Sequence, residues 1–142
     1  MEIRSGGTRD AEKILLLYRA FRGDSWDDSR MKECLHRYPS IVAYDRERLV
    51  GFAYAFDFAP DFLELANIYV EKTYRAKNLG TKILQALEKD CLEKGYKGFV
   101  LTNSFLYAPA TEKKLSPHNF YIRNGYSVAG ETEHTKIYIK IF

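Results

Sequence analysis

Apolar residues recur at two different spacings along the chain, and the changes between them divide it into helices and strands. Between 11 and 21 they recur three and four positions apart, which predicts an amphipathic helix that ends near Gly23. A second helix is expected to run towards Tyr38, where Pro39 stops it. The most regular helical pattern spans 80–94, and its apolar stripe consists of Ile83, Leu84, Leu87 and Cys91.

Extended segments separate these helices. Apolar runs predict strands at 2–4, 41–44, 49–57, 62–70, 97–102, 126–129 and 136–141, with a short helix at 117–124. Strand 62–70, helix 80–94 and strand 97–102 predict a parallel pair joined by a right-handed crossover. The elements together predict one domain, 1–142, of the α/β (α+β) class, with a mixed, mostly antiparallel sheet of six or seven strands and about four helices. Residues 104–116 show no period and are expected to form a long loop.

Composition narrows the classes of function. Hydrophobic residues make up 46% and charged residues 29%, which is typical of a globular protein. A net charge of +3, carried by scattered basic residues, excludes a nucleic-acid interface as the leading hypothesis. The cysteines and histidines have no metal-ligand spacing. No apolar signal region or membrane-length run is present, which indicates a soluble cytoplasmic protein without a membrane partner.

The segment between strand 62–70 and helix 80–94 carries the most specific chemistry. A basic turn that leads from a strand into a helix aims backbone N–H groups and the positive end of the helix dipole at one point, which is a phosphate-binding arrangement. Gly80 suits the close approach that a phosphate needs, and Asn78 tolerates a positive φ. An ordinary basic loop is the alternative, because short glycine motifs also occur by chance.

Two motifs in the chain resemble those of the GNAT superfamily of N-acetyltransferases. The spacing Arg75-x-x-Asn78-x-Gly80 is similar to the family's pyrophosphate loop, Arg/Gln-x-x-Gly-x-Gly/Ala, although Asn78 and Ala76 stand where glycine is common. Residues 117–126 are similar to the family's later block, Ala-His-x-Phe-Tyr-x-x-x-Gly-Phe. The resemblance implies a GNAT-like fold whose sheet is splayed at its centre.

The same resemblance implies acetyl-CoA as co-substrate, with its pantetheine arm lying between the two splayed strands. Backbone groups near Tyr69 and Val70 would hold that arm, and Asn103 would contact it. The residues implied to bind the coenzyme are Tyr69, Val70, Arg75, Ala76, Lys77, Asn78, Leu79, Gly80, Thr81 and Asn103. A turn-capping role is the alternative for Asn103.

Two residues are candidates for proton transfer. Tyr121 matches the position of the family's general acid in the 117–126 block. A phenol, with a pKa of ~10, is able to protonate the departing thiolate. The alternative role of Tyr121 is packing in a helix. Glu64 lies within an apolar strand, where a carboxylate is rare unless it is paired or used, and it stands where some family members carry a base. Its alternative is an exposed or ion-paired strand residue.

The acceptor side is predicted less sharply. Trp26, Asp27 and Asp28 fall in the segment that commonly forms the acceptor wall in this family, and they would suit a cationic amine. Helix capping with a solvated acidic face is the alternative that we favour.

The leading hypothesis is an N-acetyltransferase that moves an acetyl group from acetyl-CoA to a primary amine of a small molecule by direct attack. The alternatives are acetylation of a protein lysine or N-terminus, and a non-catalytic acyl-CoA sensor. A homodimer through paired edge strands is compatible with the sequence, which offers no residue-level argument for it.

Overall fold

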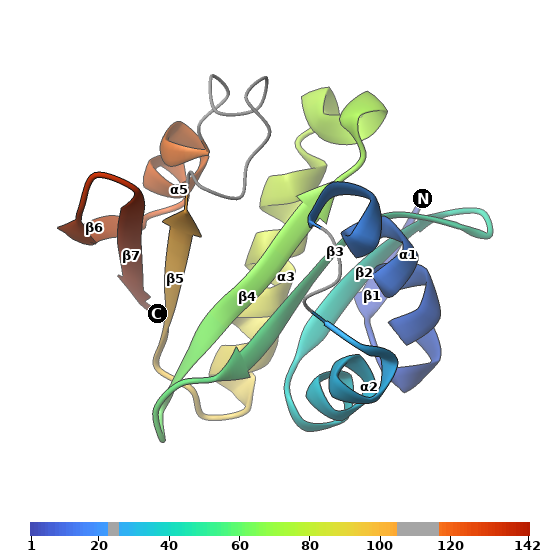
Figure 1. Ribbon diagram of the computed structural model, residues 1–142, viewed down its shortest axis with the longest axis horizontal. Helices are drawn as coiled ribbons and strands as arrows, with labels where there is room; N and C mark the ends of the chain where they lie inside the picture. The colour runs from blue at the N-terminus through green and yellow to red at the C-terminus, as the bar shows by residue number, and fades with distance from the viewer. Residues whose placement is uncertain (23–25, 105–116) are drawn as a thin grey trace.

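Seven strands within the described residues form a single mixed sheet of order β1-β2-β3-β4-β5-β7-β6 (Figure 1). The computed structural model describes residues 1–22, 26–104 and 117–142. Its strands are β1 (Glu2–Ser5), β2 (Ser40–Asp45), β3 (Arg48–Asp57), β4 (Phe62–Val70), β5 (Gly98–Ser104), β6 (Ser127–Glu131) and β7 (Thr135–Ile141). Every neighbouring pair is antiparallel except β4 and β5, which are parallel. The mixed, mostly antiparallel sheet predicted from the sequence is therefore confirmed.

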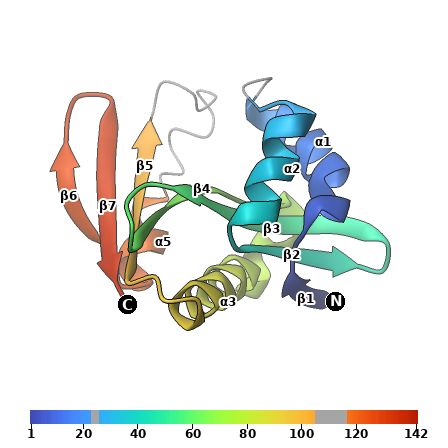
Figure 2. The same cartoon turned by 90° about the horizontal axis from the view of Figure 1, so that it is seen from below.

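Helices cover both faces of this sheet (Figure 2). The α-helices of the described residues are α1 (Ala11–Arg22), α2 (Asp28–Arg37), α3 (Leu79–Glu93) and α5 (His118–Arg123), and the 3-10 helices are η1 (Thr8–Asp10) and η2 (Lys72–Lys77). Buried side chains of α3 and α5 belong to one apolar cluster, and those of α1 and α2 belong to another on the opposite face. Among the described residues, no helix is both long enough and apolar enough to cross a membrane.

The alternation of large and small residues along β3 explains how the two layers form. Ala53 and Ala55 lie in the cluster with α3, whereas Phe52 and Tyr54 lie in the cluster with α1 and α2. Gly51 is needed for the close approach of α3, because a Cβ there would lie 2.8 Å from the Cδ1 of Ile83 and 3.2 Å from the carbonyl oxygen of Tyr69. Small side chains thus bring α3 against the sheet, and large aromatic rings fill the opposite side.

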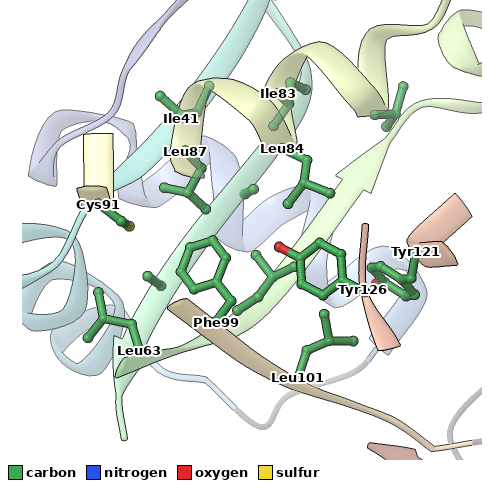
Figure 3. Close-up of a cluster of buried hydrophobic side chains, with 14 of the residues drawn as sticks. Ile41, Leu63, Ile83, Leu84, Leu87, Cys91, Phe99, Leu101, Tyr121 and Tyr126 are labelled. Carbon is green, nitrogen blue, oxygen red and sulfur yellow. The ribbon is translucent and has the colours of Figure 1, made fainter. Parts of the chain in front are cut away.

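The core beneath α3 continues into the C-terminal part of the chain. Leu84 and Leu87 point from α3 towards Phe99 and Leu101 of β5, and Ile83 belongs to the same cluster (Figure 3). Tyr121 and Tyr126 complete the same cluster, on the side of β5 that faces α3. Burial of these apolar side chains fixes α5 relative to α3 and the sheet.

A buried carboxylate anchors the first strand to the sheet edge. Asp10 accepts hydrogen bonds from the guanidinium of Arg4 (3.0 Å), the hydroxyl of Tyr44 (2.8 Å) and the backbone N–H of Gly7 (2.9 Å). Burial alone would raise the pKa of Asp10, but the hydrogen bonds from Arg4, Tyr44 and Gly7 outweigh it and lower that pKa. The folded state therefore holds Asp10 in its charged form.

The predicted boundaries agree closely with the structure, with one difference that bears on function. Strand 62–70 is found at its predicted limits, and helix 80–94 is found as Leu79–Glu93. The short turn expected after Val70 is instead the six-residue 3-10 helix η2. The long loop expected at 104–116 lies outside the described residues except for Ser104, the last residue of β5.

Candidate functional site

The sheet opens where β4 and β5 meet. The two strands pair over three positions, from Phe62 opposite Gly98 to Glu64 opposite Val100. Beyond these positions they do not pair within the described residues. A bulge at Ala66 bends β4 away, because Ala55 of β3 pairs with Leu65 whereas the preceding Tyr54 pairs with Asn67. The two strands diverge towards the end of the molecule where the turn enters α3 (Figure 1). The predicted splay at the centre of the sheet is confirmed.

A cleft of about 370 Å³ occupies this opening. Three parts of the chain meet in it: the two splayed strands, the turn that enters α3, and the start of α5. Its lining residues are Leu65, Ala66, Asn67, Ile68, Tyr69, Val70, Arg75, Asn78, Gly80, Thr81, Leu101, Thr102, Asn103, Pro117, Phe120, Tyr121 and Arg123. Two arginines and no carboxylate are among these described residues, so the charge of the lining suits an anionic ligand.

The turn into α3 has the geometry that a phosphate requires. Asn78 adopts a left-handed conformation, with φ 62° and ψ 18°, and α3 begins at the next residue. Lys82 donates the first helical hydrogen bond, to the carbonyl of Asn78. The N–H groups of Leu79, Gly80 and Thr81 precede it and therefore have no acceptor within the helix. They lie at the positive end of the α3 dipole, beside the cleft.

The turn is tied firmly to the strands that precede it. The Nε of Arg75 donates to the carbonyl of Val70 at 2.8 Å. The hydroxyl of Tyr74 donates to the carboxylate of Asp45, at the end of β2. Arg48 and Glu71 form an ion pair at the start of β3. The hairpin between β2 and β3 thus helps to set the position of the turn, which is held by tertiary contacts before any ligand binds.

Helix α5 packs against the N-terminus of α3. A Cβ at Gly80 would lie 3.2 Å from the Cε1 of Phe120, so the glycine allows this contact. The next residue, Tyr121, is 7% exposed and lines the cleft. Its ring lies 5.1 Å from that of Tyr138 and 5.9 Å from that of Tyr126, between centroids. These rings define one orientation for the predicted general acid.

Asn103 faces the cleft from β5. Its Nδ2 is buried and has no hydrogen-bond partner within the described residues. A buried amide donor is costly where nothing accepts from it, so an acceptor atom of a ligand would suit this position. A pantetheine arm carries amide carbonyls of the required kind, so the residues present fit the coenzyme.

Glu64 lies at the closed end of the opening. It occupies the last paired position of β4 before the strands separate, and the next two residues, Leu65 and Ala66, line the cleft. Glu64 itself is half-buried and is not one of the lining residues. Burial raises the pKa of its carboxyl, and the positive charge of Arg30 partly opposes that rise. A carboxyl with a raised pKa is better matched to base catalysis near neutral pH.

The predicted acceptor residues lie outside the cleft. Trp26 is buried against Tyr54 and Phe56. Asp27 caps α2 by accepting a hydrogen bond from the N–H of Arg30 at 2.7 Å, and Asp28 forms an exposed ion pair with Lys32. The capping alternative therefore describes what Asp27 does in the structure.

Some predicted coenzyme residues do not line the cleft with their side chains. Leu79 is buried in the core, and Lys77 is exposed but does not line the cleft. The side chain of Ala76 lies outside the described residues. The buried side chain of Leu79 leaves only its backbone N–H to face a ligand.

Sequence reasoning missed several residues that the fold brings to the site. Phe120 and Arg123 line the cleft from α5, and Thr102 lines it from β5. Arg30 stacks on Trp26, with its guanidinium carbon 4.0 Å from the ring centroid, and it faces the charge of Glu64. Arginine at a helix surface position carries no pattern that distinguishes it from a solvated one, so only the three-dimensional contact identifies it.

Comparison with known proteins agrees with this geometry. The model of the acetyltransferase (GNAT) domain matches residues 36–128, more than half of the chain. The chain therefore belongs to the GNAT family of acetyltransferases. An uncharacterized N-acetyltransferase, YjcF of Bacillus subtilis (strain 168), is 33% identical over 93 residues, which cover 66% of this chain and 59% of that relative. The match thus spans less than two thirds of the relative's length.

Solved structures share the fold over nearly the whole chain. The complex of an aminoglycoside 6'-N-acetyltransferase with coenzyme A has a TM-score of 0.80 at 22% identity and covers 99% of this chain and 97% of that one. The ribosomal-protein-S18-alanine N-acetyltransferase from Escherichia coli has a TM-score of 0.76 at 18% identity, with 99% and 92% covered. At these identities the likeness establishes the fold alone. The names of the two enzymes give acceptors of different kinds, an aminoglycoside and the ribosomal protein S18.

Proposed function

We propose that this protein transfers an acetyl group from acetyl-CoA to a primary amine of a small molecule by direct attack. The observation that carries the proposal is the cleft between β4 and β5. It brings the turn at Arg75–Thr81, the unpaired edges of the two strands and Tyr121 to one place. Phosphate binding, an extended channel and a proton donor are the three requirements of this reaction.

Each group has a defined task in this proposal. The N–H groups at the start of α3, with Arg75, bind the pyrophosphate of the coenzyme. The edge of β4 near Tyr69 and Val70 holds the pantetheine arm and polarises the thioester carbonyl, and Asn103 donates to the arm.

Proton transfer is divided between the two ends of the opening. Glu64 accepts the proton that the amine must lose, directly or through water, and the amine nitrogen then forms a bond to the carbonyl carbon. The carbon–sulfur bond breaks, and Tyr121 donates its phenolic proton to the sulfur. The proton that the nitrogen loses as it becomes an amide returns to the phenolate of Tyr121, directly or through water, so that Tyr121 is restored. The burial that raises the pKa of Glu64 supports its role as the base.

The sensor alternative requires a cleft that binds the coenzyme without turnover. Asn78 takes the left-handed conformation that glycine would take, so the altered motif keeps the bend of the turn. This observation supports coenzyme binding, which the enzyme and the sensor share, so turnover is the property that separates them.

The test combines binding with turnover. Calorimetry with acetyl-CoA is followed by thiol release across panels of small amines and of peptides with free lysines or N-termini. We expect binding, and thiol release that depends on a small amine and falls ~100-fold or more in Tyr121→Phe. Binding without thiol release on any acceptor would favour the sensor, and release with peptides alone would favour a protein acceptor.

A further inference from the structure

A buried carboxylate outside the cleft joins α3 to the C-terminal part of the chain. Glu88 lies two turns along α3 from the phosphate-binding end and is 9% exposed. The hydroxyl of Tyr126 donates to its Oε2 at 2.7 Å, and the Nζ of Lys140 donates to its Oε1 at 3.0 Å. Lys140 is partly buried, and replacing an ion pair that is largely withdrawn from water by apolar side chains is often neutral or stabilising, so stability alone does not account for this pair.

Both partners of Glu88 also hold the main chain on either side of Tyr121. The backbone N–H of Tyr126 donates to the carbonyl of Tyr121 at 3.0 Å. The Nζ of Lys140 donates to the carbonyl of Asn124 at 2.8 Å, and the Nδ2 of Asn124 donates to the carbonyl of Phe120 at 2.8 Å. Two short paths of hydrogen bonds, one passing through the residue Tyr126 and the other through Asn124, therefore lead from the carboxylate of Glu88 to the carbonyls of Tyr121 and Phe120.

The same network reaches the coenzyme side of the site. The Nδ2 of Asn124 lies 3.4 Å from the Oγ1 of Thr81, in the first turn of α3. Helix α5 has only six residues, and a helix this short is not stable without tertiary contacts. Its orientation relative to α3 therefore depends on the groups that hold its ends.

We propose that Glu88, with Lys140 and Tyr126, is a positioning residue that sets the hydroxyl of Tyr121 against the thioester sulfur. The inference rests on the proposed acetyl transfer and assigns Glu88 no contact with a substrate. It makes one polar network responsible for the distance between the α3 phosphate site and the acid on α5.

The test replaces the network by apolar residues of similar size. The triple variant Glu88→Leu, Tyr126→Phe, Lys140→Met leaves no unpaired buried charge, so we expect it to fold with a melting temperature at or above that of the wild type. Its kcat is expected to fall ~10- to 100-fold, with the KM for acetyl-CoA within about twofold of wild type, because small misplacements of a catalytic group have effects of this size. Glu33→Gln, which removes an exposed ion pair with Arg37 on α2, is the control.

A double-mutant cycle separates positioning from a general structural role. If the network acts through Tyr121, the triple substitution made in a Tyr121→Phe background costs little further activity. An equal loss of kcat in both backgrounds, or an unchanged kcat in the triple variant, would overturn the inference while leaving acetyl transfer established by the wild-type enzyme.

Hydrogen exchange decides the inference if the wild type turns over no amine. In that case the proposed function fails, and the network is tested on the free protein. Faster amide exchange over 118–123 in the triple variant, with exchange in β2 and β3 unchanged, would support the positioning role. Unchanged exchange over 118–123 would overturn it.

Discussion

Glu64 and Val100 form the last register pair between β4 and β5, and the cleft opens immediately beyond them. The carboxyl of Glu64 is thus fixed at the vertex of the split, on a strand that is paired on both sides. A base on a rigid strand is held at a constant distance from the channel that the strands enclose. This relationship links the strand geometry to the chemistry that the site is proposed to perform.

The pH dependence of turnover tests the role of Glu64. Because burial raises the pKa of its carboxyl, the base loses its proton only above the usual range of a glutamate. With an acceptor of low amine pKa, kcat/KM is expected to rise with pH through this raised value. Glu64→Gln is expected to lower kcat/KM ~100-fold or more and to remove that limb of the profile. An unchanged acid limb in the variant would contradict the assignment.

The left-handed conformation of Asn78 predicts opposite results for two substitutions. Asn78→Gly keeps the φ of 62° without strain, so we expect coenzyme affinity near that of the wild type. Asn78→Val places a β-branched residue in this region and is expected to cost about 1–3 kcal/mol of stability and to weaken coenzyme binding. Thermal unfolding and calorimetry measure the two effects. Equal affinities in the two variants would show that the bend does not shape the phosphate site.

The tether between Tyr74 and Asp45 predicts a change in coenzyme binding alone. Tyr74→Phe removes the hydroxyl that joins η2 to β2, so the turn becomes less ordered before the ligand binds. We expect a few-fold higher KM for acetyl-CoA with little change in kcat, measured by steady-state kinetics. Arg37→Gln on the surface of α2 is the matched control, and a loss confined to kcat would argue against the tether.

The lowered pKa of Asp10 predicts how the stability of the fold depends on pH. Although its burial opposes ionisation, the hydrogen bonds from Arg4, Tyr44 and Gly7 lower its pKa in the folded protein. A carboxyl whose pKa is lower in the folded protein than in the unfolded chain stabilises the fold at pH values above the pKa of the unfolded chain. This stabilisation is lost as the pH falls through the pKa of the folded protein. Asp10→Asn is expected to cost about 1–3 kcal/mol at pH 7 and less below pH ~4. Melting curves of the wild type and of Asp10→Asn from pH 2 to pH 7 measure how the difference in stability between them shrinks in acid.

The sequence predicts the fold more completely than the site. Local periodicity is enough to place β4 and α3 within a residue of their observed limits, and the turn residues Asn78 and Gly80 carry a recognisable spacing. The split of β4 from β5 follows from the bulge at Ala66, for which Leu-Ala-Asn gives no local signal. Interactions between distant segments depend on the packed tertiary structure and have no signature in the chain. Examples are the effect of the Arg30 charge on the carboxyl of Glu64 and the ion pair of Glu88 with Lys140.

The central claim is that the turn entering α3 binds the pyrophosphate of coenzyme A. A crystal structure of the complex with coenzyme A tests this most directly. We expect pyrophosphate oxygens within hydrogen-bond distance of the backbone N–H groups of Leu79, Gly80 and Thr81, with the pantetheine arm between β4 and β5 and in contact with Asn103. Coenzyme bound elsewhere, or a pyrophosphate that contacts none of these amides, would contradict the account.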